Sequence, residues 1–186
     1  YIQNKTPVIL ISKMSQGRKN LGKVLDLCSA PGGKALLVHD LFPDSQITVN
    51  DVNEKKMERL RENIKKYELP FGVAVGLGEG NDLTPDYDVV ICDVPCSNTG
   101  VLHKKVEARW RLEEDNLLAL EDLQLKILEK ALKGLKPEGE LWYLTCSILK
   151  NENEKIIEKA CSKFGLKVSK GYHSILPDKY GGDGGF

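Results

Sequence analysis

Two short cysteine motifs are the parts of the sequence best suited to chemistry. Cys96 lies in Asp93-Val-Pro-Cys-Ser-Asn-Thr-Gly100, and Cys146 lies in Thr145-Cys-Ser147. Each motif directly follows a predicted apolar strand and surrounds its thiol with polar or turn-forming residues. A cysteine thiol is intrinsically nucleophilic and is partly ionised near neutral pH. Because the two strands are expected to be neighbours in one sheet, Cys96 and Cys146 are predicted to face one pocket.

The remaining thiols are expected to be structural. The chain has five cysteines, an odd number, and no secretion signal, which favours reduced thiols in the cytoplasm over a disulfide between Cys96 and Cys146. Cys92 and Cys161 are predicted to be small buried apolar residues, and Cys28 to be part of a turn. A zinc site is not predicted, because no histidine cluster or second close pair completes Cys92 and Cys96.

A glycine-rich turn, Asp26-Leu-Cys-Ser-Ala-Pro-Gly-Gly-Lys34, follows the first predicted strand. Gly32 and Gly33 allow the backbone to approach a ligand, and they free amide groups at the start of the next helix for an anion. Asp51 ends the second strand, at a spacing of about 20 residues that suits hydrogen bonds to ribose hydroxyls. The pattern predicts a nucleoside-containing ligand, although it is not the Gly-x-Gly-x-x-Gly of nicotinamide sites. The alternative is a plain tight turn and a helix cap.

Short apolar runs alternate with helical patterns along the chain. Strands are expected at residues 24–28, 46–51, 71–75, 88–93, 140–145 and 166–172. Helices are expected at 33–41, 54–67 and 116–135, and up to Phe164 after a capping box of Asn151 and Glu154. This alternation predicts an α/β, Rossmann-like fold, a mostly parallel sheet with helices on both faces. Ligands of such sheets bind beyond the carboxyl ends of the strands.

Length and charge restrict the interpretation further. The 186 residues suit one domain, and the 27 basic residues equal the 27 acidic ones, so net charge does not indicate nucleic-acid binding by this piece alone. No segment has the length of a membrane span and no signal peptide opens the chain, which predicts a cytoplasmic protein without a membrane partner. The chain starts at Tyr1 and ends in a glycine-rich stretch. We therefore expect a fragment of a longer protein.

The motifs together resemble a known family. The segments Asp-Leu-Cys-Ser-Ala-Pro-Gly-Gly-Lys, Asp-Val-Pro-Cys-Ser-Asn-Thr-Gly and Thr-Cys-Ser-Ile-Leu-Lys-Asn-Glu-Asn-Glu look like those of the RNA 5-methylcytosine methyltransferases of the Sun/Nol1/Nop2 family. The bacterial small-subunit rRNA branch (Sun/Fmu) is the most similar. The resemblance covers essentially the whole chain and implies a class I methyltransferase catalytic domain over residues 1–186. By this resemblance, we expect the family's N-terminal RNA-binding region and its final strand to be missing from these 186 residues.

The resemblance also implies a cofactor and where it binds. The cofactor is S-adenosyl-L-methionine, with no metal. Its methionine end is expected at Ser29, Ala30, Pro31, Gly32, Gly33 and Lys34. Asp51 is expected at its ribose. An acid near the adenine is expected to be Glu79, with Asp82 as the alternative.

Three residues receive catalytic roles by the same resemblance. Cys146 is the expected nucleophile, and Cys96 is expected to assist release of the product. Asp93 is expected to reach the target base beside the cofactor and to stabilise charge on it. Carbon 5 of cytosine is a poor nucleophile, and addition of a thiolate to carbon 6 activates it. The expected reaction is methylation of carbon 5 of a cytosine in RNA, with rRNA as the partner and no protein partner predicted.

Some positions depart from the family, and some alternatives stay open. Val94, Asn98 and Lys150 replace the usual Ala, Gly and Pro. The segment 103–111 mixes four basic side chains with Trp110, which predicts either an RNA-facing surface or a solvated loop whose Trp packs on the core. Rival interpretations are a tRNA or DNA methyltransferase, a catalytically silent RNA-binding scaffold, and a nucleotide-dependent redox protein that uses Cys96 and Cys146.

Overall fold

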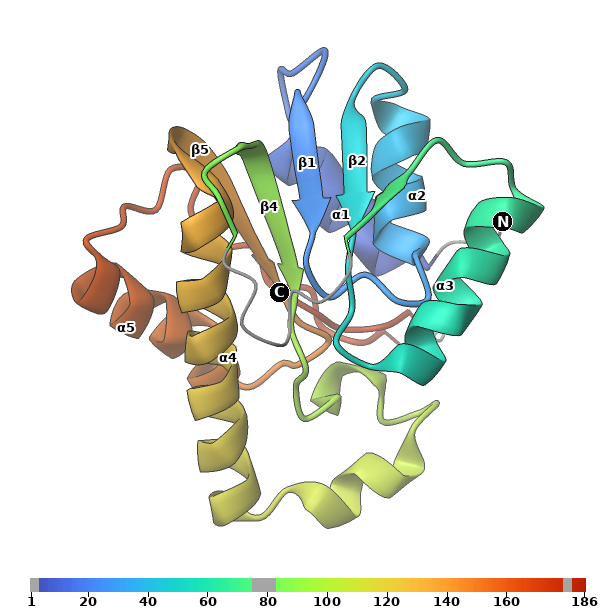
Figure 1. The fold of residues 1–186 in the computed structure, drawn as a ribbon. Coiled ribbons are helices and arrows are strands. Elements are labelled where there is room, and N and C mark those ends of the chain that lie inside the picture. The colour runs from blue at the N-terminus through green and yellow to red at the C-terminus, as the bar shows by residue number, and fades with distance from the viewer. Residues whose placement is uncertain (1–3, 75–82, 179–181) are drawn as a thin grey trace. The chain divides into compact units, whose positions relative to one another are not determined.

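A sheet of five strands in the order β3-β2-β1-β4-β5 lies within the described residues of the computed structural model, which are 4–74, 83–178 and 182–186 (Figure 1). The described residues form two compact units. The sheet unit lies within residues 15–93 and 130–142, and the thiol unit lies within residues 1–14, 94–129 and 143–186. The helix α4 (Glu114–Gly134) and the strand β5 (Leu135–Leu144) contribute residues to both units. No helix in the described part of the chain has the length and apolar character needed to cross a membrane.

The central strands of the sheet unit are parallel, as predicted. The strand β1 (Lys23–Asp26) pairs on one side with β2 (Gln46–Val49) and on the other with β4 (Tyr87–Asp93), and β2 pairs with β3 (Gly72–Val73). The predicted neighbours β4 and β5 are adjacent in the sheet order. Since all these pairs are parallel, the turn after β1 and the turn after β2 leave the same edge of the sheet.

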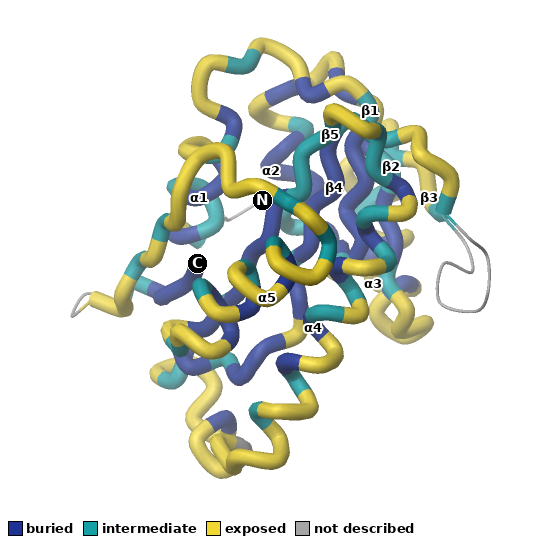
Figure 2. The backbone as a smooth tube through the Cα atoms, turned by 90° about the vertical axis from the view of Figure 1, so that its left-hand side faces the viewer, coloured by how far each residue is buried: buried dark blue, intermediate teal, exposed yellow. Residues whose placement is uncertain are grey.

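The apolar runs of β1 and β4 form the core of the sheet unit. Val24 and Leu25 of β1 are fully buried, as are the four consecutive residues 89–92 of β4 (Figure 2). A continuous apolar run is typical of a strand with both faces covered, as parallel strands require.

The two helices of the sheet unit begin and end where local chemistry predicts. The helix α2 (Gly33–Leu41) has the bounds that the sequence indicates. The helix α3 (Glu54–Lys66) begins after Asn53, whose side chain accepts a hydrogen bond from the backbone N–H of Lys56 at 3.1 Å. Met57 and Leu60 form its buried stripe.

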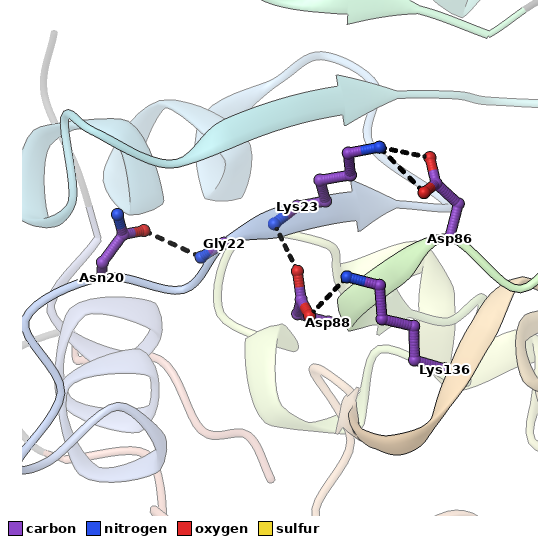
Figure 3. Close-up of polar contacts among 6 residues, drawn as sticks. All are labelled: Asn20, Gly22, Lys23, Asp86, Asp88 and Lys136. Atoms are coloured by element: carbon purple, nitrogen blue, oxygen red, sulfur yellow. Dashed lines mark hydrogen bonds and ion pairs between the residues drawn. The ribbon is translucent and has the colours of Figure 1, made fainter.

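Charged side chains join the opposite, amino-terminal ends of the strands (Figure 3). The backbone N–H of Lys23 donates to Asp88 at 2.8 Å, and its ammonium group pairs with Asp86 at 2.8 Å. Asp88 also accepts a hydrogen bond from Lys136 at 2.7 Å. The Lys136 ammonium, followed by the Lys23 backbone N–H, lowers the pKa of Asp88. These contacts are far along the strands from the glycine-rich turn, which indicates a structural role.

The thiol unit is built from short helices and loops around the end of β5. It contains α1 (Lys5–Met14), the 3-10 helices η1 (Thr99–Val101), η2 (Val106–Arg111) and η3 (Lys150–Glu152), and α5 (Glu154–Phe164). The backbone of Phe186 exchanges two hydrogen bonds with that of Thr145, at 3.0 and 3.1 Å. This pairing fixes the backbone beside Cys146.

Two local predictions about the thiol unit are wrong. The described structure has no strand over residues 166–172, where Val168 and Tyr172 are 45% and 42% exposed and no neighbouring strand pairs with them. The expected capping box of Asn151 and Glu154 is also absent, since Asn153 precedes α5 and its side chain makes no cap. The Asn153 amide instead bonds Thr145 and Ser147, at 2.7 and 3.1 Å. The hydrogen bonds of Asn153 to Thr145 and Ser147 thus take the place of a side-chain cap at the start of α5.

Candidate functional site

The two cysteines of the predicted site lie in contact within the thiol unit. The sulfur atoms of Cys96 and Cys146 are 3.1 Å apart, as a hydrogen-bonded pair of free thiols. The two thiols do not form the disulfide that the sequence disfavoured. Cys96 is buried and Cys146 is half-buried, so Cys146 is the more accessible of the two. The hydrogen bond to Cys146 and then burial raise the pKa of Cys96 above its usual range, which keeps this sulfur protonated at neutral pH.

Asn98 is a third member of the thiol site, a role that was not predicted from the sequence. Its Oδ1 accepts a hydrogen bond from the Cys146 thiol at 3.2 Å and another from the Lys105 ammonium at 2.9 Å. Its Nδ2 donates to the backbone carbonyl of Cys96 at 2.8 Å. Asn98 has a φ of 61°, in the left-handed region that favours Gly and tolerates Asn. Its departure from the family's Gly is therefore compatible with the same backbone and adds a polar contact to the thiol.

Backbone hydrogen bonds through Gly100 connect the loop after Cys96 to the backbone of Cys146 and Gly184. The N–H of Gly100 donates to the carbonyl of Cys146 at 2.9 Å, and the N–H of Gly184 donates to the carbonyl of Gly100 at 2.8 Å. A Cβ at Gly100 would lie 2.6 Å from the Gly184 oxygen and 2.8 Å from the Cys146 oxygen. Only Gly fits this position, so the Gly that closes the first cysteine motif is required for the loop packing.

The other thiols lie in less reactive surroundings. Cys92 is fully buried in β4, and burial raises its pKa well above the ordinary value. Burial, followed by the charge of Asp26, raises the pKa of Cys28 to about 12. Cys161 on α5 is half-buried rather than fully buried as expected. A thiolate, the reactive form, is disfavoured at Cys28 and Cys92.

The glycine-rich turn of the sheet unit contains buried polar atoms without an ordinary hydrogen bond. Asp26 and Ser29 are 0% and 5% exposed, and they lie close enough together to interact. Neither the Asp26 carboxylate oxygens nor the Ser29 hydroxyl makes a hydrogen bond of ordinary length and angle among the described residues. Burial and then the neighbouring Asp93 carboxylate raise the pKa of Asp26 to about 7. Buried polar groups normally have partners. A ligand that brings hydrogen-bond donors to this turn would satisfy Asp26.

Neighbouring side chains hold this turn in place. Gly32 has a φ of 101°, and a Cβ there would lie 2.7 Å from Leu60 of α3. The N–H of Ser29 donates to the carbonyl of Asn50 at 2.8 Å, and the Asn63 amide donates to the carbonyl of Pro31 at 2.8 Å. Since the helix α2 begins at Gly33, its N-terminus lies at the end of this turn.

Three of the remaining predicted site residues also lie in the sheet unit. Lys34, at the start of α2, forms an ion pair with Asp93 at the end of β4, so both predicted residues already have a charged partner. Asp51 is half-buried, and its Oδ1 accepts the N–H of Asn53 at 3.0 Å. Asn53 rather than Asp51 therefore precedes and caps α3, which removes the helix-cap alternative for Asp51.

Glu79 and Asp82, the alternatives for the adenine end of the cofactor, lie outside the described residues. Within the described ranges no group of three or more His, Cys, Asp or Glu side chains is arranged to hold a metal ion. The cofactor fit therefore depends on the turn from Asp26 to Lys34 and on Asp51. Hydrogen-bond acceptors at buried Asp26, backbone N–H groups and a second carboxylate suit a nucleoside that carries an amino acid.

The sheet order and the position of this turn define a Rossmann-like methyltransferase of the α/β class. The chain belongs to the 16S rRNA methyltransferase RsmB/F family, whose model matches residues 15–184. Both the predicted fold class and the predicted family are thereby confirmed.

Curated relatives carry the same family name in several bacteria. Ribosomal RNA small subunit methyltransferase B of Photorhabdus laumondii subsp. laumondii is 33% identical over 174 residues, which are 88% of this chain and 41% of that protein. The protein of the same name from Proteus mirabilis is 32% identical over 171 residues, 90% of this chain and 40% of that protein. The chain thus spans about two fifths of the length of these relatives.

Solved structures show the same fold. PH0851 is 28% identical with a TM-score of 0.79, over 100% of this chain and 45% of that one. A methyltransferase homolog protein from Pyrococcus horikoshii is 29% identical with a TM-score of 0.70, over 98% of this chain and 58% of that one. NSun6 from Pyrococcus horikoshii with SFG is 20% identical with a TM-score of 0.78, over 100% of this chain and 51% of that one.

Proposed function

We propose that this chain binds S-adenosylmethionine and transfers its methyl group to carbon 5 of a cytosine in RNA, through a covalent intermediate on Cys146. The observation that carries the proposal is the contact between the thiols of Cys96 and Cys146 at 3.1 Å. A reaction that first adds and later eliminates a thiol needs both a nucleophile and a proton-transfer group, and two adjacent thiols of unequal exposure supply them.

The cofactor fit supports the same reaction. When bound, S-adenosylmethionine supplies an electrophilic methyl group. Asp26 and Ser29, buried and without an ordinary hydrogen bond, would accept hydrogen bonds from the methionine end, and the N–H groups that follow Gly32 would face its carboxylate. Asp51 would accept hydrogen bonds from the ribose hydroxyls through the oxygen that does not bond Asn53.

Each thiol has a distinct task in the proposed reaction. The Cys146 thiolate would form a bond to carbon 6 of the cytosine. The ring electrons would then form the bond from carbon 5 to the methyl group, while the bond from the methyl group to the sulfonium sulfur breaks and its electron pair stays on that sulfur. The carbon 5 proton must leave before the Cys146–carbon 6 bond breaks and the thiolate returns. Burial and its hydrogen bond keep the Cys96 thiol protonated, so a water that Cys96 positions would accept the carbon 5 proton. Asp93 would bond the base and stabilise charge that develops during attack.

The direct test is product identification. The chain is incubated with S-adenosylmethionine and either small-subunit rRNA, tRNA or DNA, and the nucleosides are then separated by mass spectrometry. We expect 5-methylcytidine from the rRNA, with less from tRNA and no methylated base from DNA. Methylation at a nitrogen or at the ribose would contradict the thiol mechanism. Binding of RNA and S-adenosylmethionine without any product would favour the silent scaffold.

An exposed tryptophan supports RNA as the substrate. Trp110 on η2 is 82% exposed, so the alternative in which it packs on the core is wrong. Arg109 beside it is exposed as well, whereas Lys104 and His103 pair with Asp183 at 2.7 and 3.2 Å. Exposed aromatic side chains bind single-stranded nucleic acid by stacking on the bases. A target cytosine must leave its stack before it can react, so a stacking surface beside the thiol motif is useful.

Trp110→Ala is expected to weaken RNA binding about tenfold or more, since base stacking on an aromatic ring contributes about 1–3 kcal/mol. Fluorescence anisotropy with a labelled single-stranded RNA measures the dissociation constant, and Trp110→Phe should retain most of the affinity. Leu176→Ala removes another apolar side chain of the thiol unit, 70% exposed, and serves as the control. Equal losses in the two alanine variants would show that Trp110 has no specific role.

A further inference from the structure

Glu152 is a buried carboxylate whose contacts join the two cysteine motifs. It lies at the end of η3 in the thiol unit and is 0% exposed. Its Oε1 accepts hydrogen bonds from the backbone N–H of Ser97 at 2.8 Å and from the Gln124 amide at 3.2 Å. Its Oε2 accepts from the hydroxyls of Ser97 and Ser147, at 2.5 and 2.6 Å. Both serines directly follow the thiols, so one carboxylate holds both motifs.

The hydrogen-bond network around this carboxylate has one consistent arrangement of donors. The Ser147 hydroxyl accepts the N–H of Leu149 at 3.0 Å and lies 2.9 Å from the Thr99 hydroxyl, which in turn accepts the N–H of Ile148 at 3.1 Å. The Ser147 hydroxyl proton is therefore directed toward Glu152. The Ser97 hydroxyl lies 3.2 Å from the Thr99 hydroxyl but is closer to Glu152, at 2.5 Å. The position of Glu152 thus depends on donors from both motifs.

Gln124 of α4 extends the network to the other side of Cys96. The Tyr143 hydroxyl donates to the backbone carbonyl of Glu152 at 2.6 Å and lies 3.1 Å from the Gln124 Oε1. The Gln124 Nε2 donates to Glu152 at 3.2 Å and to the carbonyl of Pro95 at 3.0 Å. Pro95 and Ser97 flank Cys96 on the chain. The Cys96 backbone is therefore held from both sides, through groups that all meet Glu152 or its partner Gln124.

We propose that Glu152 is a positioning residue that holds the thiols of Cys96 and Cys146 in contact. The role follows from the carboxylate shared by Ser97 and Ser147, and its importance for catalysis rests on the proposed function. Residues 96 and 146 are 50 positions apart in the chain, so their contact depends on tertiary interactions between the two motifs. Of the side chains described here, Glu152 is the one whose carboxylate accepts hydrogen bonds from both residues that follow the thiols.

The disulfide equilibrium of the two thiols measures their contact without RNA or cofactor. With glutathione disulfide as oxidant, Cys96 and Cys146 each lose a proton and one bond forms between the sulfurs, while one glutathione disulfide becomes two glutathione thiols. The equilibrium constant reports the effective concentration of one thiol at the other. Glu152→Gln keeps the side-chain volume but replaces one carboxylate oxygen by an NH₂ group. This group cannot accept a hydrogen bond from the serine hydroxyls or from the Gln124 amide that surround it. We expect this variant to lower the equilibrium constant at least tenfold, equal to about 30 mV.

Two further variants separate positioning from general destabilisation. Ser97→Ala with Ser147→Ala keeps Glu152 but removes both hydroxyl donors, and should shift the equilibrium in the same direction. Glu121→Gln changes another buried carboxylate of the thiol unit, which pairs with Lys159 at 2.5 Å, and should leave the equilibrium unchanged. Alkylation of the free thiols followed by mass spectrometry gives the oxidised fraction. An unchanged equilibrium in both Glu152→Gln and the serine double variant would overturn the proposal.

Catalysis supplies a second readout. With RNA that carries 5-fluorocytidine, Glu152→Gln should form the covalent adduct at least tenfold more slowly at saturating RNA, while its RNA affinity equals that of the parent chain. Glu121→Gln should change neither quantity. A fall in RNA affinity with an unchanged rate at saturation would contradict positioning of the thiols. If the parent chain forms no adduct, the proposed function fails, whereas the disulfide equilibrium still decides the role of Glu152.

Discussion

Cys146→Ala is expected to abolish the covalent adduct that the chain forms with RNA carrying 5-fluorocytidine. After thiol addition and methyl transfer, carbon 5 of this base carries fluorine and has no proton to lose, so the Cys146–carbon 6 bond cannot break. The parent chain should therefore accumulate an adduct, and only when S-adenosylmethionine is present. Denaturing gel electrophoresis with labelled RNA detects it, and removal of a nucleophile is expected to lower its formation by orders of magnitude.

Cys96→Ala should have the opposite effect on ordinary RNA. If Cys96 assists removal of the carbon 5 proton, its loss leaves addition possible but slows elimination, so the covalent species should accumulate without fluorine. Cys161→Ala changes another free thiol of the thiol unit, on α5, and should behave as the parent chain does. An adduct that persists in Cys146→Ala and disappears in Cys96→Ala would reverse the two roles. No trapped species in Cys96→Ala would contradict a release role.

The sequence predicted those parts of the fold that depend on apolar patterns. The amphipathic pattern of α3 has helical spacing, and the apolar run of β4 is short and rich in β-branched residues, which favours a strand over a buried helix. The contact of Cys96 with Cys146 was also predictable, since the motifs follow neighbouring strands. The expected strand at 166–172 is absent because an apolar alternation forms a strand only where a partner strand is available.

Other features of the site depend on tertiary contacts that no local pattern specifies. The Asn153 side chain makes no cap on α5 and instead bonds Thr145 and Ser147. The segment that was predicted to form a capping box is therefore part of the thiol site. Glu152, in the same charged stretch, is typical of a solvated helix start but is fully buried. Asn98 carries one usable signal, since Asn tolerates the left-handed conformation that its position in the Ser-Asn-Thr-Gly loop adopts.

Asp26→Asn is expected to make the stability of the chain much less dependent on pH above about 5. Burial and the nearby Asp93 carboxylate raise the folded-state pKa of Asp26 from 3.8 to about 7. A raised pKa in an acid means that the fold favours the protonated form. Its favourable contribution is therefore present below about pH 4 and is lost as pH rises through about 7. The shift corresponds to about 4 kcal/mol, since each unit is about 1.4 kcal/mol.

Urea unfolding between pH 5 and pH 8 measures the larger part of this contribution, about 3 kcal/mol, because about two pH units of the loss lie above pH 5. The free energy of unfolding of the parent chain should fall relative to that of Asp26→Asn as the pH rises. Asp88→Asn is the matched control in the same unit, because Lys136 lowers the pKa of Asp88 and its stabilising contribution is lost as pH falls rather than as it rises. The free energies of unfolding of the parent chain and of Asp26→Asn could differ by the same amount at pH 5 and at pH 8. That result would show that Asp26 does not titrate in this range.

The same titration links Asp26 to the proposed cofactor. A ligand that brings a cationic donor to the Asp26 carboxylate favours its ionised form and lowers its pKa. S-adenosylmethionine should therefore raise the unfolding free energy of the parent chain more at pH 8 than at pH 5, and this pH dependence should disappear in Asp26→Asn. An analogue without the amino group should stabilise both chains equally at the two pH values. If this analogue shows the same pH dependence as S-adenosylmethionine, the amino group is not the partner of Asp26.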